Sequence, residues 1–230
     1  SIPARNEPLD PLIQAETKEN YAELRQAARI ERSGIISIFP PNEDSAKQAD
    51  DSEFNARMDE RWEHGGFGFY RAYADIGIDQ TSNERIAEYV RGQITQVVDD
   101  PETARLLAPT NTIACKRPCL DTHYYETFNG DHVNLVDISE RGIEEITQTG
   151  LRAADQDFEF DALVFATGFD AMTGSLQKLG LIGKNGIRLE DFWRSGPQTY
   201  LGLAIPNFPN LITITGPGSP SVLTNMPRSI

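Results

Sequence analysis

The chain has 230 residues, of which 39% are hydrophobic and 24% are charged, a composition typical of a globular protein that buries a core. Asp and Glu number 35 against 21 Lys and Arg, which leaves a formal net charge of −14. Because such an acidic surface repels phosphate polymers and anionic lipids, we expect neither nucleic acid nor a membrane as a partner.

In the first 110 residues, the apolar residues recur mainly at helical spacing. We expect helices over residues 10–32, 52–64 and 81–98, and a short turn of helix that opens at Pro101. The first is expected to be an amphipathic surface helix, and the third to bury a stripe that includes Ile86, Val90 and Ile94. Residues 40–51 hold two prolines, several acids and few apolar side chains, which predicts an exposed loop.

From Asn111 onward the chain changes to short segments rich in β-branched and aromatic residues. These predict strands over residues 133–138, 143–147, 151–153, 158–160 and 162–166, followed by two buried strands over 200–205 and 211–215. A helical block, then strands, then a strand that runs into a turn indicates an α/β protein rather than a bundle or a sandwich.

A basic pair, Lys116 and Arg117, stands between Cys115 and Pro118-Cys119. In most proteins such a pair is a solvated surface dipeptide, and that interpretation stays open here. In so acidic a chain, however, the pair is a local positive spot, and Pro118 restricts Arg117 to an extended conformation. A lysine can meet a phosphate as a point charge, and an arginine offers a planar fork of donors to a developing oxyanion.

The two cysteines have a C-x3-C spacing, but His64, His123 and His132 are scattered, so we predict no metal site. Two cysteines are also too few for a disulfide-stapled secreted fold. No apolar run approaches the ~20 residues of a membrane span, and the chain does not begin with a signal-peptide pattern. We therefore expect a cytoplasmic protein.

Two glycine turns follow apolar segments, Ala-Thr-Gly-Phe-Asp at 166–170 and Gly-Pro-Gly-Ser-Pro-Ser at 216–221. Either can be an ordinary strand exit. Alternatively, the first marks a crossing between two nucleotide-binding domains, and the second a cofactor lying across strand ends. The chain contains no G-x-G-x-x-G, G-x-S-x-G, P-loop or H-E-x-x-H motif, which argues against the commonest hydrolases, kinases and zinc proteases.

An ordered set of motifs carries a resemblance to a known family: Lys116-Arg117-Pro118, Tyr124-Tyr125-Glu126, Phe128-Asn129, residues 166–171, Thr199-Tyr200-Leu201-Gly202, Phe208-Pro209-Asn210 and residues 216–226. Together they resemble the C-terminal portion of the Baeyer–Villiger monooxygenases, in particular the group of cyclohexanone, phenylacetone and steroid monooxygenases. The resemblance spans the chain and is weaker in the helical part, where Trp62 to Gly66 is the best anchor.

The resemblance implies a flavoenzyme in which NADPH reduces FAD, O2 forms a flavin peroxide, and the peroxide converts a ketone to an ester or lactone. It implies that Lys116 holds the 2′-phosphate of NADPH. Arg117 is implied as the catalytic residue, which also contacts the cofactor and stabilises the negative charge that develops on oxygen. The implied partners are FAD, NADPH, O2 and a small ketone.

Further roles are implied for residues of the two glycine turns and of the segment after them. Cofactor contacts are implied for Thr167, Gly168, Asp170, Asn225 and Met226. A substrate pocket is implied for Ser221, Val222, Leu223, Thr224 and Met226. The backbone of Asn225 and Met226 would lie at the start of a helix, whose N-terminus stabilises negative charge on the flavin.

The implied architecture is an α/β flavoprotein with FAD and NADP Rossmann-like domains and a helical insertion. Residues 1–109 would form the helical insertion of the NADP domain, residues 110–165 its remaining strands, and residues 166–230 the linker and returning segment of the FAD domain. The family's dinucleotide fingerprints would lie upstream of Ser1, in another part of the same protein. A non-catalytic fragment therefore stays an alternative, as does a related flavin monooxygenase that acts on sulfur or nitrogen.

Overall fold

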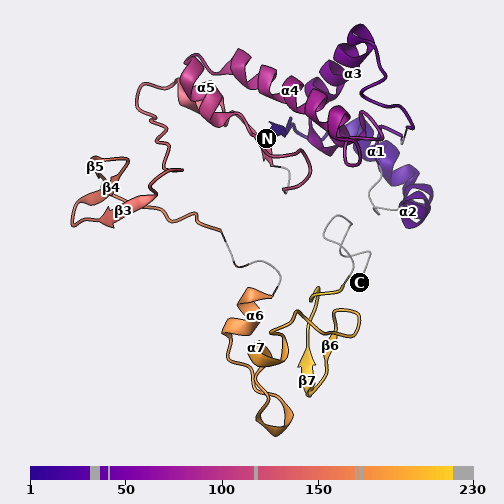
Figure 1. Cartoon of the computed structure of the whole chain (residues 1–230). Helices are drawn as coiled ribbons and strands as arrows, with labels where there is room; N and C mark the ends of the chain where they lie inside the picture. The colour runs from indigo at the N-terminus through magenta and orange to yellow at the C-terminus, as the bar shows by residue number, and fades with distance from the viewer. Residues whose placement is uncertain (32–36, 41, 117–118, 169, 171–172, 220–230) are drawn as a thin grey trace. The chain divides into compact units, whose positions relative to one another are not determined.

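The computed structural model describes residues 1–31, 37–40, 42–116, 119–168, 170 and 173–219 (Figure 1). It divides into two compact units, each with a hydrophobic core. Unit 1 consists of Ser1–Pro11 and Ser37–Leu163, and unit 2 consists of Leu12–Ile36 and Val164–Ile230. Among the helices described, none is long and apolar enough to cross a lipid bilayer.

The helices of unit 1 confirm those predicted after residue 51. They are α3 (Asp51–His64), α4 (Gln80–Val97) and α5 (Pro101–Leu107). An aspartate caps the start of each, because its carboxylate accepts a backbone N–H of the first turn: Asp50 from Glu53 at 2.9 Å, Asp79 from Ser82 at 3.0 Å and Asp100 from Thr103 at 2.8 Å. Such caps satisfy N–H groups that have no partner inside the helix.

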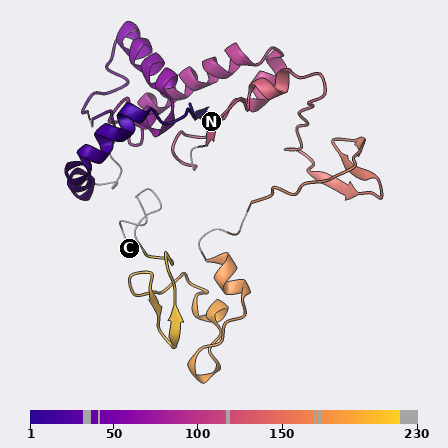
Figure 2. The ribbon, with the colours of Figure 1, turned by 180° about the vertical axis from the view of Figure 1, so that it is seen from behind.

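Side chains of α3 and α4, the two longest helices of unit 1 in Figures 1 and 2, form much of its core. Phe54 and Met58 of α3 are 4% and 0% exposed, and Ile86, Val90 and Ile94 of α4 are 0%, 5% and 1% exposed. Their spacing of three or four residues places them on one side of each helix, and burial of that side drives the packing. The stripe predicted on the helix over 81–98 is confirmed.

Short elements complete the helical part of unit 1. They are the strand β1 (Ile2–Pro3), the 3-10 helix η1 (Gly66–Arg71), the strand β2 (Leu120–Asp121) and the 3-10 helix η2 (Glu126–Asn129). β1 and β2 pair in parallel. Gly65 ends α3 with φ 72°, and a Cβ there would lie 2.5 Å from the carbonyl oxygen of Pro3. Glycine therefore allows β1 to approach the end of α3.

The loop predicted over 40–51 has only short turns in its described residues before Asp51, where α3 begins, but it is not simply exposed. Ala46 is fully buried, and its N–H donates to Asp75 at 3.1 Å. The hydroxyls of Ser45 and Ser82 also donate to Asp75, at 2.5 and 2.6 Å. Three donors thus converge on one carboxylate and hold the loop against the start of α4, which the low apolar content of the loop did not reveal.

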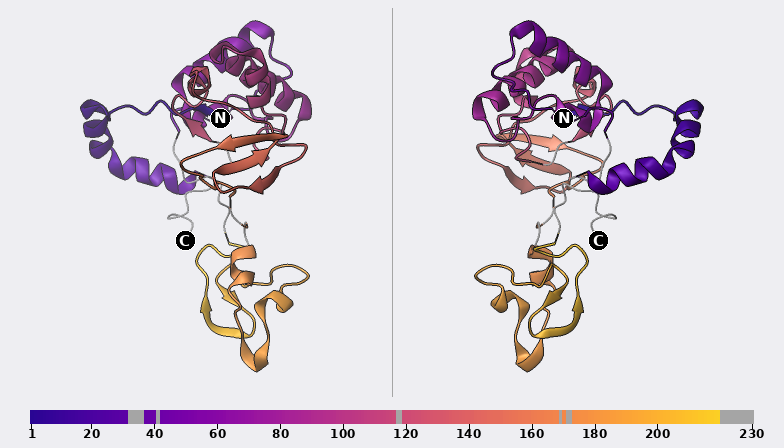
Figure 3. Two further views of the ribbon diagram at one scale, coloured as in Figure 1. Left: turned by 90° about the vertical axis from the view of Figure 1, so that its left-hand side faces the viewer. Right: turned by 90° about the vertical axis from the view of Figure 1, so that its right-hand side faces the viewer.

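The strands of unit 1 form an antiparallel sheet of three, in the order β3 (Ile143–Ile146), β4 (Gly150–Ala153) and β5 (Gln156–Glu159) (Figure 3). They confirm, with boundaries moved by one or two residues, the strands predicted over 143–147, 151–153 and 158–160. Gly150 pairs with Glu159, and a Cβ at Gly150 would lie 1.8 Å from the carbonyl oxygen of Phe158. Only glycine fits at this crossing of β4 and β5.

The strands predicted over 133–138 and 162–166 are wrong, because both segments are irregular in the structure. Val164 and Phe165 are 83% and 62% exposed. β-Branched and aromatic composition favours a strand only where another strand supplies the hydrogen-bonding ladder. No strand among the described residues pairs with either segment.

Unit 2 begins with α1 (Pro11–Glu19, whose first residue belongs to unit 1) and α2 (Tyr21–Ile30). A single helix was predicted over 10–32, but Asn20, with φ −95° and ψ 15°, separates the two helices. Neither helix buries a residue, which confirms their position at the surface. The predicted end of that helix, at residue 32, lies outside the described residues.

The rest of unit 2 consists of short elements around a small core. They are α6 (Gly174–Lys178), the 3-10 helix η3 (Lys184–Gly186), α7 (Leu189–Phe192), β6 (Ala204–Ile205) and β7 (Phe208–Ile212). The buried core residues are Leu189, Trp193, Ile205 and Phe208. β6 and β7 pair antiparallel and replace the two longer strands predicted over 200–205 and 211–215. The prediction that those strands are buried is wrong for Tyr200 and Ile212, which are 71% and 75% exposed.

Candidate active site

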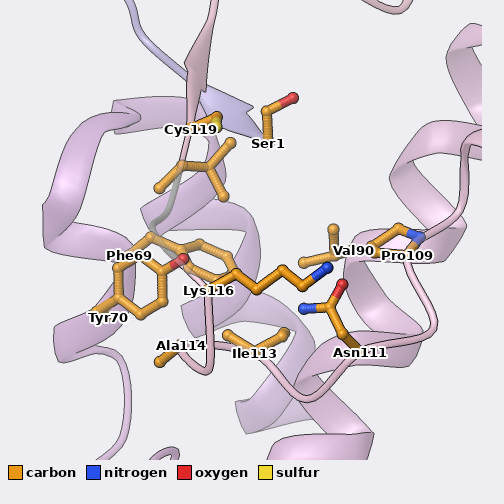
Figure 4. A pocket seen from close by; sticks show the side chains of 11 residues that line it. Ser1, Phe69, Tyr70, Val90, Pro109, Asn111, Ile113, Ala114, Lys116 and Cys119 are labelled. Atoms are coloured by element: carbon orange, nitrogen blue, oxygen red, sulfur yellow. The ribbon is translucent and has the colours of Figure 1, made fainter. Parts of the chain in front are cut away.

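Lys116 lies in a pocket of unit 1 with a volume of about 220 Å³. The pocket is lined by residues of β1, η1 and α4 and of the loop between α5 and β2: Ser1, Ile2, Phe69, Tyr70, Val90, Pro109, Asn111, Ile113, Ala114, Lys116 and Cys119. Figure 4 shows the Lys116 side chain running across this pocket, past the rings of Phe69 and Tyr70, with its ammonium group directed towards Asn111. The structure thus places the predicted phosphate-binding lysine in a hollow.

The pocket combines one cationic side chain with a largely apolar lining. Lys116 contributes the one charged side chain among the described lining residues. Burial raises the pKa of Tyr70, with a smaller contribution from Cys119, so its phenol stays a hydrogen-bond donor over the working pH range. Lys116 is exposed, so solvent screens its ammonium group, and the apolar walls reduce that screening only on the side where they lie. The pocket therefore suits an anionic group attached to an apolar or planar body.

The size of the pocket limits what it can hold. Small-molecule sites typically have volumes of roughly 300–1,000 Å³. A volume of about 220 Å³ is smaller, so this hollow can take part of a dinucleotide, such as a phosphate and its sugar, and not the whole molecule. The residues present fit a phosphate group of that kind.

Two backbone contacts hold the loop that carries Lys116. On one side, the carbonyl oxygen of Cys119 accepts a hydrogen bond from the N–H of Ile2 at 3.0 Å, next to the β1–β2 pair. On the other side, both backbone groups of Ile113 bond to the side-chain amide of Asn83 on α4. Sequence reasoning missed Asn83, although its position three residues before Ile86, on the buried side of α4, was a usable signal.

The first glycine turn exposes its backbone. Thr167 and Gly168 are exposed, and Gly168 has φ 85°, a conformation that favours glycine. No atom lies within 4 Å of a Cβ built at Gly168, so a ligand can approach the backbone there. The carboxylate of Asp170 forms an ion pair with Lys178 of α6, so this side chain has a structural role within unit 2.

The second glycine turn packs against the motif Thr199 to Gly202. The Thr199 hydroxyl donates to the carbonyl oxygen of Pro217 at 2.6 Å and accepts the N–H of Gly202 at 3.2 Å. The Thr213 hydroxyl donates to the carbonyl oxygen of Gly202 at 2.6 Å. A Cβ at Gly202 would lie 2.7 Å from the carbonyl oxygen of Gly216, so glycine permits this contact. Two motifs separated in the sequence thus form one packed unit.

Several predicted site residues lie outside the residues that the structure describes. They are Arg117, Ser221, Val222, Leu223, Thr224, Asn225 and Met226. Of the predicted cofactor contacts that are described, Lys116 belongs to unit 1, and Thr167, Gly168 and Asp170 belong to unit 2. Cys115 and Cys119 are both exposed. Within the described ranges, no group of three or more His, Cys, Asp or Glu residues is placed to hold a metal ion.

Sequence relatives align with the whole chain, although no family model matches it. The chain is 36% identical to a Baeyer–Villiger monooxygenase of Pseudooceanicola batsensis and 34% identical to cyclohexanone 1,2-monooxygenase of Acinetobacter. It is also 36% identical to phenazine N-monooxygenase of Lysobacter antibioticus. Each alignment covers 100% of this chain and 42% of the relative, so the chain spans less than half the length of these curated relatives.

Solved structures give the same result at the level of the fold. A steroid monooxygenase bound to NADP superimposes with a TM-score of 0.85 and 44% identity, over 100% of this chain and 44% of that one. A monooxygenase abbreviated OTEMO, in complex with FAD and NADP, gives a TM-score of 0.90 with 33% identity, over 99% and 43% of the two chains. The resemblance and the flavoprotein fold class inferred from the motifs are confirmed. Over its whole length the chain is similar to part of the Baeyer–Villiger monooxygenases.

Proposed function

We propose that the protein to which this chain belongs is an FAD- and NADPH-dependent Baeyer–Villiger monooxygenase, which uses O2 to oxidise a ketone to an ester or lactone. The observation that carries the proposal is the identity of 34–36% over the whole chain with a Baeyer–Villiger monooxygenase and a cyclohexanone 1,2-monooxygenase. The complexes of structural relatives with FAD and NADP support the two cofactors. The order of the motifs along the chain supports it as well.

Lys116 is proposed to hold the 2′-phosphate of NADPH. Three features support this role: its single positive charge in the pocket, the apolar walls, and a volume that suits a phosphate group and not a whole dinucleotide. A point charge on a flexible stem can follow a phosphate. The role predicts discrimination between NADPH and NADH, because NADH lacks the 2′-phosphate.

Arg117 is proposed as the catalytic residue. The bound flavin supplies the activation of O2. The guanidinium group of Arg117 would stabilise the negative charge that develops on oxygen during transfer to the ketone. It would act as a fixed cation, because an arginine side chain stays protonated in proteins. This role rests on the position of Arg117 next to Lys116 in the motif.

The roles of the remaining site residues are proposed mainly from the sequence motifs. Thr167 and Gly168 would contact the cofactor through their exposed backbone, and the open space at Gly168 supports this. Asp170 would act by its main chain, since its carboxylate is paired with Lys178. Asn225 and Met226 would contact the flavin, and residues 221–224 would line the substrate pocket with Met226.

We also propose a domain assignment, with residues 1–109 as the helical insertion of the NADP domain, 110–165 as its remaining strands, and 166–230 as the returning segment of the FAD domain. The exposed apolar segments over 133–138 and 162–166 support it, because strands of this composition are usually buried in a sheet. The rest of the same protein would supply the partner strands and the dinucleotide fingerprints. A cytoplasmic location fits this cofactor chemistry and stays a prediction.

Replacement of Arg117 tests the proposed activity in the full-length protein. Arg117→Ala should lower ester or lactone formation at least about 100-fold, the scale of losing a positioned donor to a developing oxyanion, while NADPH still reduces the flavin. Stopped-flow absorbance follows flavin reduction, and chromatography follows the product. Lys116→Ala is the neighbouring control and should raise KM for NADPH with little change in kcat. An unchanged ester yield in Arg117→Ala would contradict the assignment.

A related monooxygenase that acts on nitrogen or sulfur is the second candidate, favoured by the 36% identity to phenazine N-monooxygenase over the whole chain. Product analysis with a ketone, a sulfide and an N-heteroaromatic compound separates the candidates. If the ester is a minor product and the N-oxide or sulfoxide dominates, the second candidate is correct. Flavin absorbance of the isolated 230-residue chain tests whether this part can act as more than a non-catalytic fragment.

A further inference from the structure

Asn83 occupies a buried position in the first turn of α4, where it is 4% exposed. Its Nδ2 donates to the carbonyl oxygen of Ile76 at 2.6 Å and to that of Ile113 at 3.1 Å. Its Oδ1 accepts the N–H of Ile113 at 3.0 Å. The amide therefore satisfies both backbone groups of Ile113, which requires a donor and an acceptor on one short side chain.

Ile113 connects this clamp to the pocket. It lines the pocket and stands three residues before Lys116. The chain turns directly after it, because the N–H of Cys115 donates to the carbonyl oxygen of Thr112 at 3.2 Å. A displacement of Ile113 therefore displaces the turn from which the Lys116 side chain extends into the pocket.

We propose that Asn83 is a positioning residue for Lys116, and that its clamp on Ile113 sets how tightly the pocket holds the 2′-phosphate of NADPH. This inference rests on the proposed function of Lys116. Asn83 does not line the pocket, so it acts on the ligand through the loop and not by contact. Loss of the amide leaves two buried carbonyl groups and one N–H without their partner, which favours another loop conformation.

The specificity for the 2′-phosphate separates positioning from a general loss of structure. In the full-length, FAD-loaded protein, Asn83→Ala should raise the Kd for NADP+ about tenfold. This is the scale of effect expected when one or two hydrogen bonds no longer hold the loop in its binding conformation. The Kd for NAD+ should change less than about twofold, because NAD+ has no 2′-phosphate for Lys116 to hold. Isothermal titration calorimetry measures both constants.

Asn129 provides a matched control in the same unit. Its Nδ2 donates to the carbonyl oxygen of Val97 at 2.8 Å, and its Oδ1 accepts the N–H of Asp99 at 2.9 Å. It therefore bridges the backbone as Asn83 does, but it is not among the residues that line the pocket. Asn129→Ala should leave the ratio of the Kd values for NAD+ and NADP+ unchanged, even where it lowers Tm.

Two additions keep the inference falsifiable if Asn83→Ala does not fold. Asn83→Asp keeps the shape and the acceptor for the Ile113 N–H but loses both donations, so the same selective loss of NADP+ affinity is expected. In the unchanged protein, hydrogen–deuterium exchange at the Ile113 amide should slow more with NADP+ than with NAD+. Equal protection by the two nucleotides contradicts the inference.

The outcomes also separate this inference from the proposed function. If Asn83→Ala or Asn83→Asp changes the two Kd values by the same factor, or changes neither, Asn83 has no positioning role although Lys116 keeps its own. If Lys116→Ala leaves the Kd for NADP+ unchanged, the proposed role of Lys116 fails, and the inference fails with it.

Discussion

Lys116 carries a positive charge into a pocket of a chain whose formal net charge is −14. In such a chain the surrounding field is negative, so an anion is attracted only where a cation lies close to it and water is partly excluded. The pocket places apolar side chains beside Lys116, although Lys116 itself is exposed to solvent. We propose that the local placement of Lys116, and not the overall charge, allows this protein to bind a phosphate.

The sequence alone predicted Lys116 but not Asn83. Lys116 is visible because a basic pair followed by a proline stands out locally in an acidic chain. The role of Asn83 depends on Ile113, which is 30 residues away, so no local pattern contains both partners. A polar residue in register with the buried stripe of an amphipathic helix is the one hint that the sequence holds, because such a residue needs a hydrogen-bond partner.

The Thr199 hydroxyl should stabilise the contact between the two C-terminal motifs. Thr199→Val keeps the shape but leaves the Pro217 carbonyl and the Gly202 N–H without this partner, which should lower the free energy of unfolding by about 1–3 kcal/mol. Urea unfolding of the full-length protein, followed by circular dichroism, measures the change.

Thr95→Val is the control for this substitution. The Thr95 hydroxyl is exposed and donates only within α4, to the carbonyl oxygen of Arg91 at 3.0 Å, so its loss should cost less than about 0.5 kcal/mol. If Thr199→Val is no more destabilising than Thr95→Val, the Thr199 hydroxyl does not hold the turn.

The elements differ in how far the sequence could predict them. α3 and α4 were predicted to within one residue, and the start of α5 at Pro101 was predicted as well, because an amphipathic helix satisfies its own backbone and needs only one apolar side. The segments over 133–138 and 162–166 were predicted as strands and are irregular, because a strand needs a partner that local composition does not specify. The loop over 40–51 is mostly exposed, as predicted, but its anchoring was not predicted, since Asp75 lies elsewhere in the sequence.

Asp75 should make the stability of unit 1 depend on pH. Burial by itself raises the pKa of Asp75, but hydrogen bonds from Ser45, Ser82 and Ala46 outweigh it and hold the pKa below its ordinary value of 3.8. The ionised carboxylate therefore stabilises the fold. This contribution is present in full above the ordinary pKa and is lost as the pH falls through the lower, folded-state pKa.

Asp75→Asn removes this contribution. The variant should be less stable than the unchanged protein at pH 7 by about 1–3 kcal/mol, the usual scale for hydrogen bonds to a charged group. The difference should shrink as the pH falls below 3.8 and through the lower pKa of the folded state, where the carboxylate of the unchanged protein becomes protonated. Thermal unfolding at pH 7 and at pH 3 measures it, with the exposed Asp131→Asn as control. A difference that is the same at both pH values would show that the charge of Asp75 is not what anchors the loop.

At the scale of the whole molecule, the order of short motifs carried more information than any single element. Lys116-Arg117, the turn at 166–170, Thr199 to Gly202 and the turn at 216–221 are each weak alone, and their order along the chain indicated the family. The structure brings the last two together in unit 2, which spacing alone does not predict. The sequence could not define the pocket at Lys116, because the residues that line it come from four separated segments.

Oxygen transfer to a ketone is the central claim, and labelled O2 tests it most directly. The full-length protein is incubated with NADPH, a cyclic ketone and ¹⁸O2, and the product is analysed by mass spectrometry. We expect a lactone that contains one ¹⁸O atom, inserted between the carbonyl carbon and its neighbour, with formation that depends on NADPH. A lactone that takes its ring oxygen from water, or NADPH oxidation with no oxygenated ketone product, would contradict the account.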